Sequence, residues 1–147
     1  MHGNVGYEGV YSVVCQTTNA HCNHANAPNV TASLEGHSST VYSVAFDGIG
    51  GTLASGSDDH TVKVWDVATG ECLRTLEGAG GRVLACAGGT LASGSADQTV
   101  KVWDAATGEC LRTLEGHSDP VWSVAFDPSG GTLASGSWDQ TVKVWVV

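Results

Sequence analysis

The sequence predicts an all-β protein built from short antiparallel strands, and three observations support this class. Three near-copies of one unit fill residues 34–147, each containing TLASGS followed by TVKVW. The tryptophans that end the second motif, Trp65, Trp103 and Trp145, are 38 and 42 residues apart. Apolar runs of about five residues alternate with Gly and Asp turns, without helical periodicity. A period of this length is typical of repeat proteins, whose units bury their apolar faces against one another.

The first repeat contains the four strands expected in every unit. Its runs are rich in Val and Thr, and Gly-Gly and Asp-Asp pairs separate them. Both faces of these runs carry apolar residues, so each sheet is expected to pack between neighbouring sheets, with its first strand buried. The predicted strands are 41–46, 52–57, 61–65 and 71–76.

The charge of the chain narrows the classes of partner. Against 15 acidic residues there are only 6 basic ones, which gives a formal charge of −9. This balance argues against nucleic acids and anionic membranes and favours a basic partner. No stretch is long enough for a membrane span, and no secretory signal is recognised. Five cysteines without CxxC spacing indicate a reduced, intracellular protein, either cytoplasmic or nuclear.

Matching dipeptides mark the ends of the repeats. Gly36-His37 and Gly116-His117 open two of them, and Trp65-Asp66 and Trp103-Asp104 lie near their ends. With these motifs the sequence resembles the WD40 β-propeller repeats over about 114 of its 147 residues. The resemblance implies four-stranded antiparallel blades around a central axis, with each outermost strand supplied by the start of the next repeat. The expected repeats are 34–75, 76–113 and 114–147.

Three blades fall below the smallest closed propeller ring, which has about four. Copies of the chain, another subunit or a longer propeller could complete the ring, since open blades would expose apolar faces and strand edges. Residues 1–33 are interpreted either as an N-terminal leader or as a degenerate blade. In the second case VTASL, residues 30–34, could supply the outer strand that the third repeat lacks.

Ser, His and Asp recur at matching offsets in the repeats, a combination that also occurs in hydrolase triads. A catalytic site has no reason to recur in each blade. The resemblance implies instead a structural hydrogen-bond chain from the Trp N–H through Ser and His to the turn Asp. In the second repeat Ala79 replaces the His, so this chain is expected to be broken or bridged by water. The predicted structural residues are His37, Ser55, Asp59, Trp65, Ser93, Asp97, Trp103, His117, Ser135, Asp139 and Trp145.

No catalytic residue, metal site or cofactor is predicted. Cys15, His21, Cys22 and His24 have the composition of a zinc site, but their spacing is irregular, which favours a polar loop. Cys72 and Cys110 take the same place in successive repeats and are expected to be too far apart for a disulfide.

Differences between the repeats are concentrated at two positions, one after the strand-opening Val and one before the turn Asp. In the resembled family these positions face the mouth of the ring, where partners bind. The alternative is drift at tolerant surface sites, but two tryptophans in the third repeat argue against it there, because Trp is enriched in binding hot spots. None of the six is Arg or Lys, so Arg-based recognition of phosphopeptides is not expected. The six predicted partner-binding residues are Tyr42, Asp58, Leu84, Ala96, Trp122 and Trp138.

The sequence therefore predicts a non-catalytic scaffold that binds a basic or apolar peptide or protein at the mouth of its blades. The alternative is a structural subunit whose blade edges and faces are buried by partner chains. Either way, the chain is expected to be an oligomer or part of a larger complex. An enzyme or metal protein that uses the N-terminal His and Cys residues is the least favoured interpretation.

Overall fold

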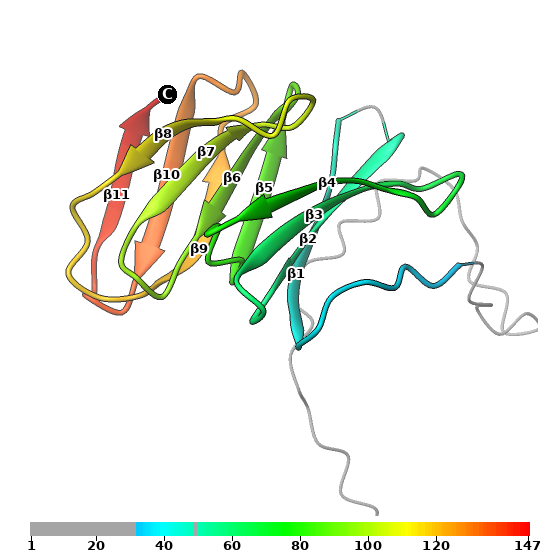
Figure 1. The fold of residues 1–147 in the computed structure, drawn as a ribbon. Helices are drawn as coiled ribbons and strands as arrows, with labels where there is room; N and C mark the ends of the chain where they lie inside the picture. The colour runs from blue at the N-terminus through cyan, green and yellow to red at the C-terminus, as the bar shows by residue number, and fades with distance from the viewer. Residues whose placement is uncertain (1–31, 49) are drawn as a thin grey trace, which may run out of the picture. The chain divides into compact units, whose positions relative to one another are not determined.

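The computed structural model of the chain describes residues 32–48 and 50–147, and all regular structure in these ranges is β-strand. Three antiparallel sheets follow one another along the chain (Figure 1). The first contains β1 (Val41–Phe46), β2 (Thr52–Ser57), β3 (Thr61–Asp66) and β4 (Cys72–Glu77). The second contains β5 (Val83–Ala87), β6 (Thr90–Gly94), β7 (Val100–Asp104) and β8 (Cys110–Leu114). The third contains β9 (Val121–Phe126), β10 (Thr132–Ser137) and β11 (Val142–Val146).

The same tight turn joins the second and third strands of every sheet. In the first sheet the Asp59 carboxylate accepts hydrogen bonds from the backbone N–H and the hydroxyl of Thr61, at 2.9 and 2.7 Å. His60, between them, has a φ of 66°. Gln98 and Gln140 hold the same left-handed conformation in the other two turns. The turn Asp stabilises this conformation, which non-glycine residues rarely adopt.

The first strands of the three sheets differ in register. β1 and β9 each contain a bulge, located at Tyr42 and at Trp122, where the pairing with the second strand shifts by one residue. β5 is one residue shorter and pairs with β6 without a bulge. Equivalent residues of the three first strands must therefore be identified by their pairing with the second strand and not by counting along the sequence.

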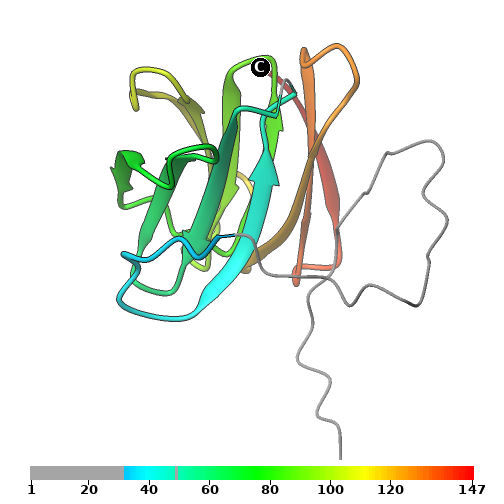
Figure 2. The same cartoon turned by 90° about the vertical axis from the view of Figure 1, so that its right-hand side faces the viewer.

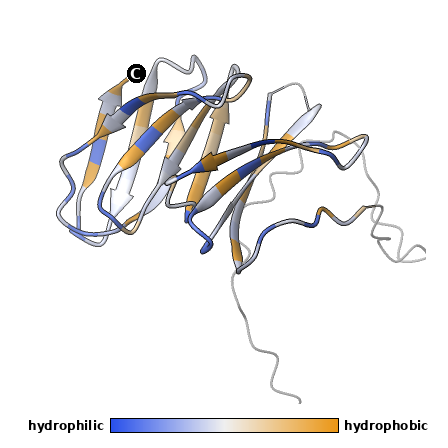
Figure 3. Ribbon diagram, viewed as in Figure 1, coloured by the Kyte–Doolittle hydropathy of each residue, from blue (hydrophilic) through white to orange (hydrophobic). Residues whose placement is uncertain are grey.

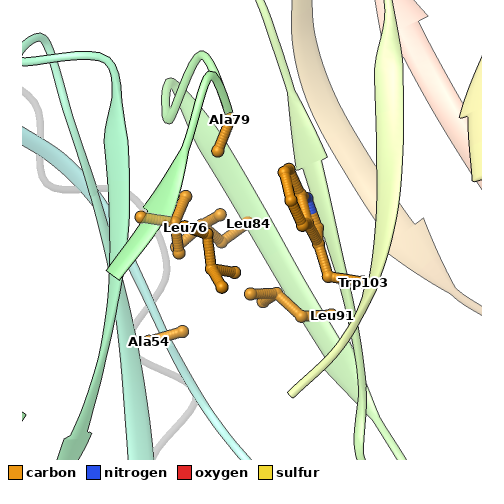
Figure 4. Packing of buried hydrophobic residues seen from close by; sticks show 7 residues of the cluster. Ala54, Leu76, Ala79, Leu84, Leu91 and Trp103 are labelled. Carbon is orange, nitrogen blue, oxygen red and sulfur yellow. The ribbon is translucent and has the colours of Figure 1, made fainter. Parts of the chain in front are cut away.

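Two apolar clusters join the sheets, and the second sheet takes part in both. Between the first and second sheets, Ala54, Val62 and Leu76 meet Leu84, Leu91 and Trp103, as most of them appear in Figure 4. Between the second and third sheets, Val100 and Val102 meet Val121, Val124 and Leu133. The expected packing of sheet against sheet is therefore present at both internal contacts.

The outer flanks depart from this expectation. The first strand of the first sheet was expected to be buried, but Val41, Val44 and Phe46 are exposed. Val142, Val144 and Val146 of β11 are exposed as well. Figure 1 and the turned view in Figure 2 place β1 and β11 on opposite flanks of the described sheets. Figure 3 shows hydrophobic segments on β11 alternating with hydrophilic ones. The prediction of burial failed here because it assumed a neighbouring sheet on both sides.

Candidate protein-interaction face

The predicted partner-binding positions were assigned by counting from the strand-opening Val, and the strand register corrects one of them. Leu84 pairs with Ser93, just as Val44 pairs with Ser55 and Val124 pairs with Ser135. Leu84 is buried in the cluster between the first and second sheets, so its side chain is not available to a partner. The count is wrong by two because Val83, taken as the strand-opening Val, pairs as Ser43 does and not as Val41 does.

Arg82 takes the place that was assigned to Leu84. It precedes Val83, which pairs with Gly94 as Ser43 pairs with Gly56. Tyr42 and Trp122 likewise precede the residues that pair with the glycine of the second strand. The premise that no Arg or Lys occupies this position is therefore wrong. The sequence feature that could have identified this position is Arg82 itself, which stands directly before the apolar run 83–87.

Four side chains from the three sheets form one cluster, which we call the aromatic cluster: Tyr42, Arg82, Trp122 and Trp138. The Arg82 guanidinium carbon lies 5.3 Å from the ring centre of Tyr42 and 4.7 Å from that of Trp122. Trp122 stacks on Trp138, with ring centres 4.9 Å apart and planes inclined by 28°. These distances are typical of cation–π and offset-stacked contacts.

The members of the aromatic cluster differ in exposure. Trp138 is 67% exposed, which is unusual for the largest apolar side chain. Trp122 is partly buried, and its indole Nε1 is covered without a hydrogen-bond acceptor among the described residues. Arg82 is partly buried and lies 3.8 Å from a carboxylate oxygen of Asp58. Trp138 is therefore the member whose ring is most open to a partner.

A shallow hollow lies beside the aromatic cluster, between the first and second sheets. Its volume is about 260 Å³, and Asp58, Arg82, Ala96 and Asp97 are among the residues that line it. The carboxylates of Asp58 and Asp97 outnumber the guanidinium of Arg82, so these lining residues carry a net negative charge. The structure thus brings Asp58 and Ala96 together at the hollow, which Arg82 of the aromatic cluster also lines.

The hydrogen-bond chain of the first sheet runs through four side chains. The Trp65 indole N–H donates to Ser55 Oγ at 2.7 Å, and Ser55 Oγ lies 2.7 Å from His37 Nε2. His37 Nδ1 lies 2.8 Å from Asp59 Oδ2. A carboxylate only accepts hydrogen bonds, so Nδ1 carries the proton, and Nε2 of a neutral ring accepts from the Ser hydroxyl. The Ser55 hydroxyl then donates one hydrogen bond and accepts another.

The third sheet repeats this chain with nearly the same geometry. Trp145 Nε1 donates to Ser135 Oγ at 2.8 Å, Ser135 Oγ lies 2.8 Å from His117 Nε2, and His117 Nδ1 lies 2.7 Å from Asp139 Oδ2. Ser135 and His117 are buried. A buried Ser whose oxygen already accepts a Trp N–H has no room for a substrate, so this arrangement does not resemble an activated nucleophile.

The turn carboxylates are held in their charged form. For Asp139, hydrogen bonds from Thr141 are the largest cause of a pKa well below the ordinary value, and desolvation opposes them. For Asp59, desolvation is the largest single effect and raises the pKa, but hydrogen bonds from Thr61, His37 and the Ser38 backbone together outweigh it and lower the pKa. Both carboxylates are thus held ionised, in the form that only accepts hydrogen bonds.

In the second sheet only the first contact of this hydrogen-bond chain and its turn Asp are present. Trp103 Nε1 donates to Ser93 Oγ at 3.0 Å, and the Asp97 carboxylate accepts from Thr99. Ala79, in place of the His, is buried in the apolar cluster beside Trp103, where Figure 4 shows it. No side chain among the described residues connects Ser93 to Asp97, in line with the expected break.

Other features bear on alternative chemistries. Cys15, His21, Cys22 and His24 lie outside the described residues, and within residues 32–48 and 50–147 no cluster of His, Cys, Asp or Glu could hold a metal ion. Cys72, Cys86 and Cys110 are free thiols. Burial raises the pKa of Cys86 to about 12, and the charge of Asp47 adds to the shift. No helix of the described structure is long and apolar enough to cross a membrane.

Consecutive antiparallel sheets of three or four strands that pack face to face, with a Trp–Ser–His–Asp chain in the first and the third, define the class of β-propeller blades. The family model described as WD domain, G-beta repeat matches residues 28–66, 70–104 and 108–146. The chain therefore belongs to the WD40 family. β4 lies in the second match and β8 in the third, but they pair with β3 and β7 of the preceding sheets. This is the strand exchange that the family resemblance implied.

Relatives with known names share single repeats with this chain. The Ribosome biogenesis protein BOP1 homolog of Drosophila virilis is 55% identical over 42 residues, which are 29% of this chain and 5% of the relative. The Vegetative incompatibility protein HET-E-1 of Podospora anserina is 60% identical over 40 residues, 27% of this chain and 3% of the relative. The chain thus matches only a small part of these much longer proteins.

Solved structures of WD40 repeats are similar over most of the chain. The crystal structure of RRP9 WD40 repeats superposes with a TM-score of 0.74 and 29% identity, covering 78% of this chain and 37% of that one. The structure of U3-55K gives the same TM-score and identity and covers 78% of this chain and 38% of the other. The fold predicted from the sequence, WD40-type blades of antiparallel strands, is confirmed.

Proposed function

We propose that this chain is a non-catalytic interaction module that binds a peptide or protein segment at the aromatic cluster. The observation that carries the proposal is the exposed ring of Trp138, stacked on Trp122, which in turn lies over Arg82. Membership of the WD40 family supports it, because propellers of this family generally act as protein-interaction scaffolds. Tyr42 and Asp58 belong to the same face.

The geometry of the stack suits binding because it is already ordered. One face of the Trp138 ring rests on Trp122, and Trp122 is held by Arg82 on the neighbouring sheet. A side chain that is fixed before binding loses little conformational entropy when a partner arrives. Ordered tryptophans at the centre of a face are the residues that most often dominate binding energy.

Charge indicates the chemistry of the partner. The backbone N–H of Trp138 donates to the Pro120 carbonyl, and Asp139 follows Trp138 in the sequence. The chain as a whole carries a charge of −9. A Lys or Arg side chain over the open face of Trp138 would gain about 0.5–2 kcal/mol from a cation–π contact. We therefore propose a partner segment that presents a basic or apolar side chain to this ring.

A second role is supported by the exposed apolar strands at both flanks of the sheets. Such surfaces suit a subunit of a larger assembly, and one relative is named for ribosome biogenesis. Another is named for vegetative incompatibility, so the names do not agree on a process. We propose that the chain acts inside the cell, in the cytoplasm or nucleus, within a complex.

Selection from a displayed random-peptide library tests the binding role. The folded chain is the bait, and Trp138→Ala serves for counter-selection. Peptides with basic or apolar residues should be enriched, and their affinity should fall about 30-fold, or about 2 kcal/mol, with Trp138→Ala. Leu111→Ala, at an exposed apolar residue of β8, is the matched control and should bind normally. Peptides that bind both variants equally would place the interaction elsewhere.

A further inference from the structure

One sequence segment is found in two environments within this chain. The motif TVKVW contributes Val62 and Val64 to β3, and these are 0% and 4% exposed. Val100 and Val102 of β7 are 0% and 2% exposed, because the third sheet covers them. Their counterparts on β11, Val142 and Val144, are 72% and 69% exposed. We call Val142, Val144 and Val146 the β11 face.

The opposite flank shows the complementary difference. Val121 and Val124 of β9 are 0% and 8% exposed, because they pack on the second sheet. The equivalent Val41 and Val44 of β1 are 47% and 45% exposed, and Phe46 is 59% exposed. We call Val41, Val44 and Phe46 the β1 face. The β11 face thus presents one half of the contact that joins the sheets, and the β1 face presents the other half.

The glycine of each TLASG motif gives independent evidence for the contact between successive sheets. A methyl group added at Gly94 would come within 2.7 Å of Val83 on its own sheet and within 2.9 Å of Val121 on the next sheet, and one at Gly56 would clash with the Gly81 carbonyl oxygen. The following sheet therefore approaches both glycines too closely for a side chain there. A methyl group at Gly136, the third counterpart, would meet only Ser123 of its own sheet, at 3.6 Å. Gly136 has the small size that a docked sheet needs, although no sheet formed by residues 32–48 and 50–147 covers it.

We propose that the β11 face of one copy docks on the β1 face of a second copy, in the packing that already joins the sheets within the chain. The interface is heterologous, because two different surfaces meet, so each copy keeps one free face after the first contact. Two copies of three sheets give six blades, which lies within the usual range of about 4–8 for a closed ring. The proposal rests on the strand faces and does not depend on a ligand at the aromatic cluster.

Complementation between two blocked variants tests the proposal with the full chain. Gly136→Val adds a side chain on the β11 side, where its first carbon meets only Ser123 at 3.6 Å, and Phe46→Lys places a charge on the β1 face. Each variant alone loses one half of the contact and should be monomeric, with a molar mass of 15.0 kDa by light scattering. Mixed in equal amounts, they retain one intact half each and should form a dimer of about 30 kDa, twice 15.0 kDa.

Controls separate this contact from unspecific association. Unaltered chain should form assemblies at concentrations where both variants are monomeric, and Leu111→Lys, on the exposed side of β8, should assemble like it. Circular dichroism verifies that the variants fold, and Val142→Lys replaces Gly136→Val if that variant does not. A monomeric unaltered chain at about 100 μM, association that survives in both blocked variants, or a mixture that stays monomeric would each overturn the proposal.

Discussion

The guanidinium of Arg82 lies between the rings of Tyr42 and Trp122, 5.3 Å from the centre of the first and 4.7 Å from that of the second. These residues belong to three different sheets, so one cation from the second sheet connects the first and the third at the end of their strands. Trp138 extends the stack outward. Arg82, which takes the place of Tyr42 and Trp122 in the second repeat, therefore holds the aromatic cluster together.

Replacing Arg82 by Leu should destabilise the fold. The substitution keeps an apolar stem but removes the cation from two aromatic rings, each contact being worth about 0.5–1 kcal/mol where it is partly exposed. We expect a loss of about 1 kcal/mol in the free energy of unfolding, measured by urea denaturation followed through Trp fluorescence. Arg82→Lys should recover only part of it, because an ammonium does not stack as a planar guanidinium does.

Substitution of Arg112 is the control for Arg82→Leu, because it also removes one positive charge from this acidic chain. It is exposed on β8, without a ring beneath it among the described residues. Arg112→Leu should leave the free energy of unfolding within about 0.5 kcal/mol, as surface substitutions usually do. Equal losses for the two variants would mean that net charge, and not the stacking of Arg82, causes the effect.

Trp138 and Trp122 should respond differently to truncation, although the sequence treats them as a pair. Trp138→Ala removes an exposed ring and should weaken partner binding by about 2 kcal/mol with little change in the melting temperature. Trp122→Ala removes a partly buried ring that touches both Arg82 and Trp138, so it should also cost about 1–2 kcal/mol of stability. Isothermal titration and thermal melting of both variants separate these outcomes.

Equal stability losses for the two variants would contradict this assignment. That result would mean that Trp138 is part of the packing between sheets, and that the binding site lies on another surface.

The repeats made most of the fold predictable, because identical segments such as TLASGS and TVKVW must adopt the same local structure wherever they occur. The strands of the first repeat are observed within one residue of their predicted ends. The same Trp–Ser contact recurs in all three sheets, since Ser and Trp keep a constant spacing of 10 residues.

The sequence was less informative where one repeat departs from the others. Counting residues aligned Leu84 with Tyr42, because Val83 has the sequence position of a strand-opening Val but pairs as Ser43 does. Only the pairing of Leu84 with Ser93 reveals the shift and identifies Arg82 as the equivalent residue. Exposure was equally hidden, since Val62 and Val142 have the same neighbours in sequence and differ only in what packs against them.

Removing single donors from the hydrogen-bond chain tests its contribution. Trp65→Phe keeps most of the ring but deletes the N–H that Ser55 accepts, while His37 and Asp59 remain. We expect a loss of about 1–2 kcal/mol in the free energy of unfolding, because a buried hydrogen bond is removed from a connected network. Trp103→Phe is the matched comparison, since its chain ends at Ser93, and it should cost less.

Urea denaturation of both variants gives the comparison directly. If Trp103→Phe were as costly as Trp65→Phe, ring packing rather than the connected chain would account for the loss.

The pH dependence of stability should show the turn carboxylates titrating on the acid side. Asp59 and Asp139 have lowered pKa values in the folded chain, through hydrogen bonds from the following Thr residues and the His rings. A group whose folded pKa lies below its unfolded value stabilises the fold fully above the unfolded value, about 4 for Asp, and this contribution is lost as the pH falls toward the folded pKa. The free energy of unfolding, measured between about pH 2.5 and 7, should therefore fall steeply below about pH 4. The double variant Asp59→Asn with Asp139→Asn should be less stable at neutral pH and show a shallower acid slope. An acid slope that the double variant leaves unchanged would assign the loss of stability to other carboxylates.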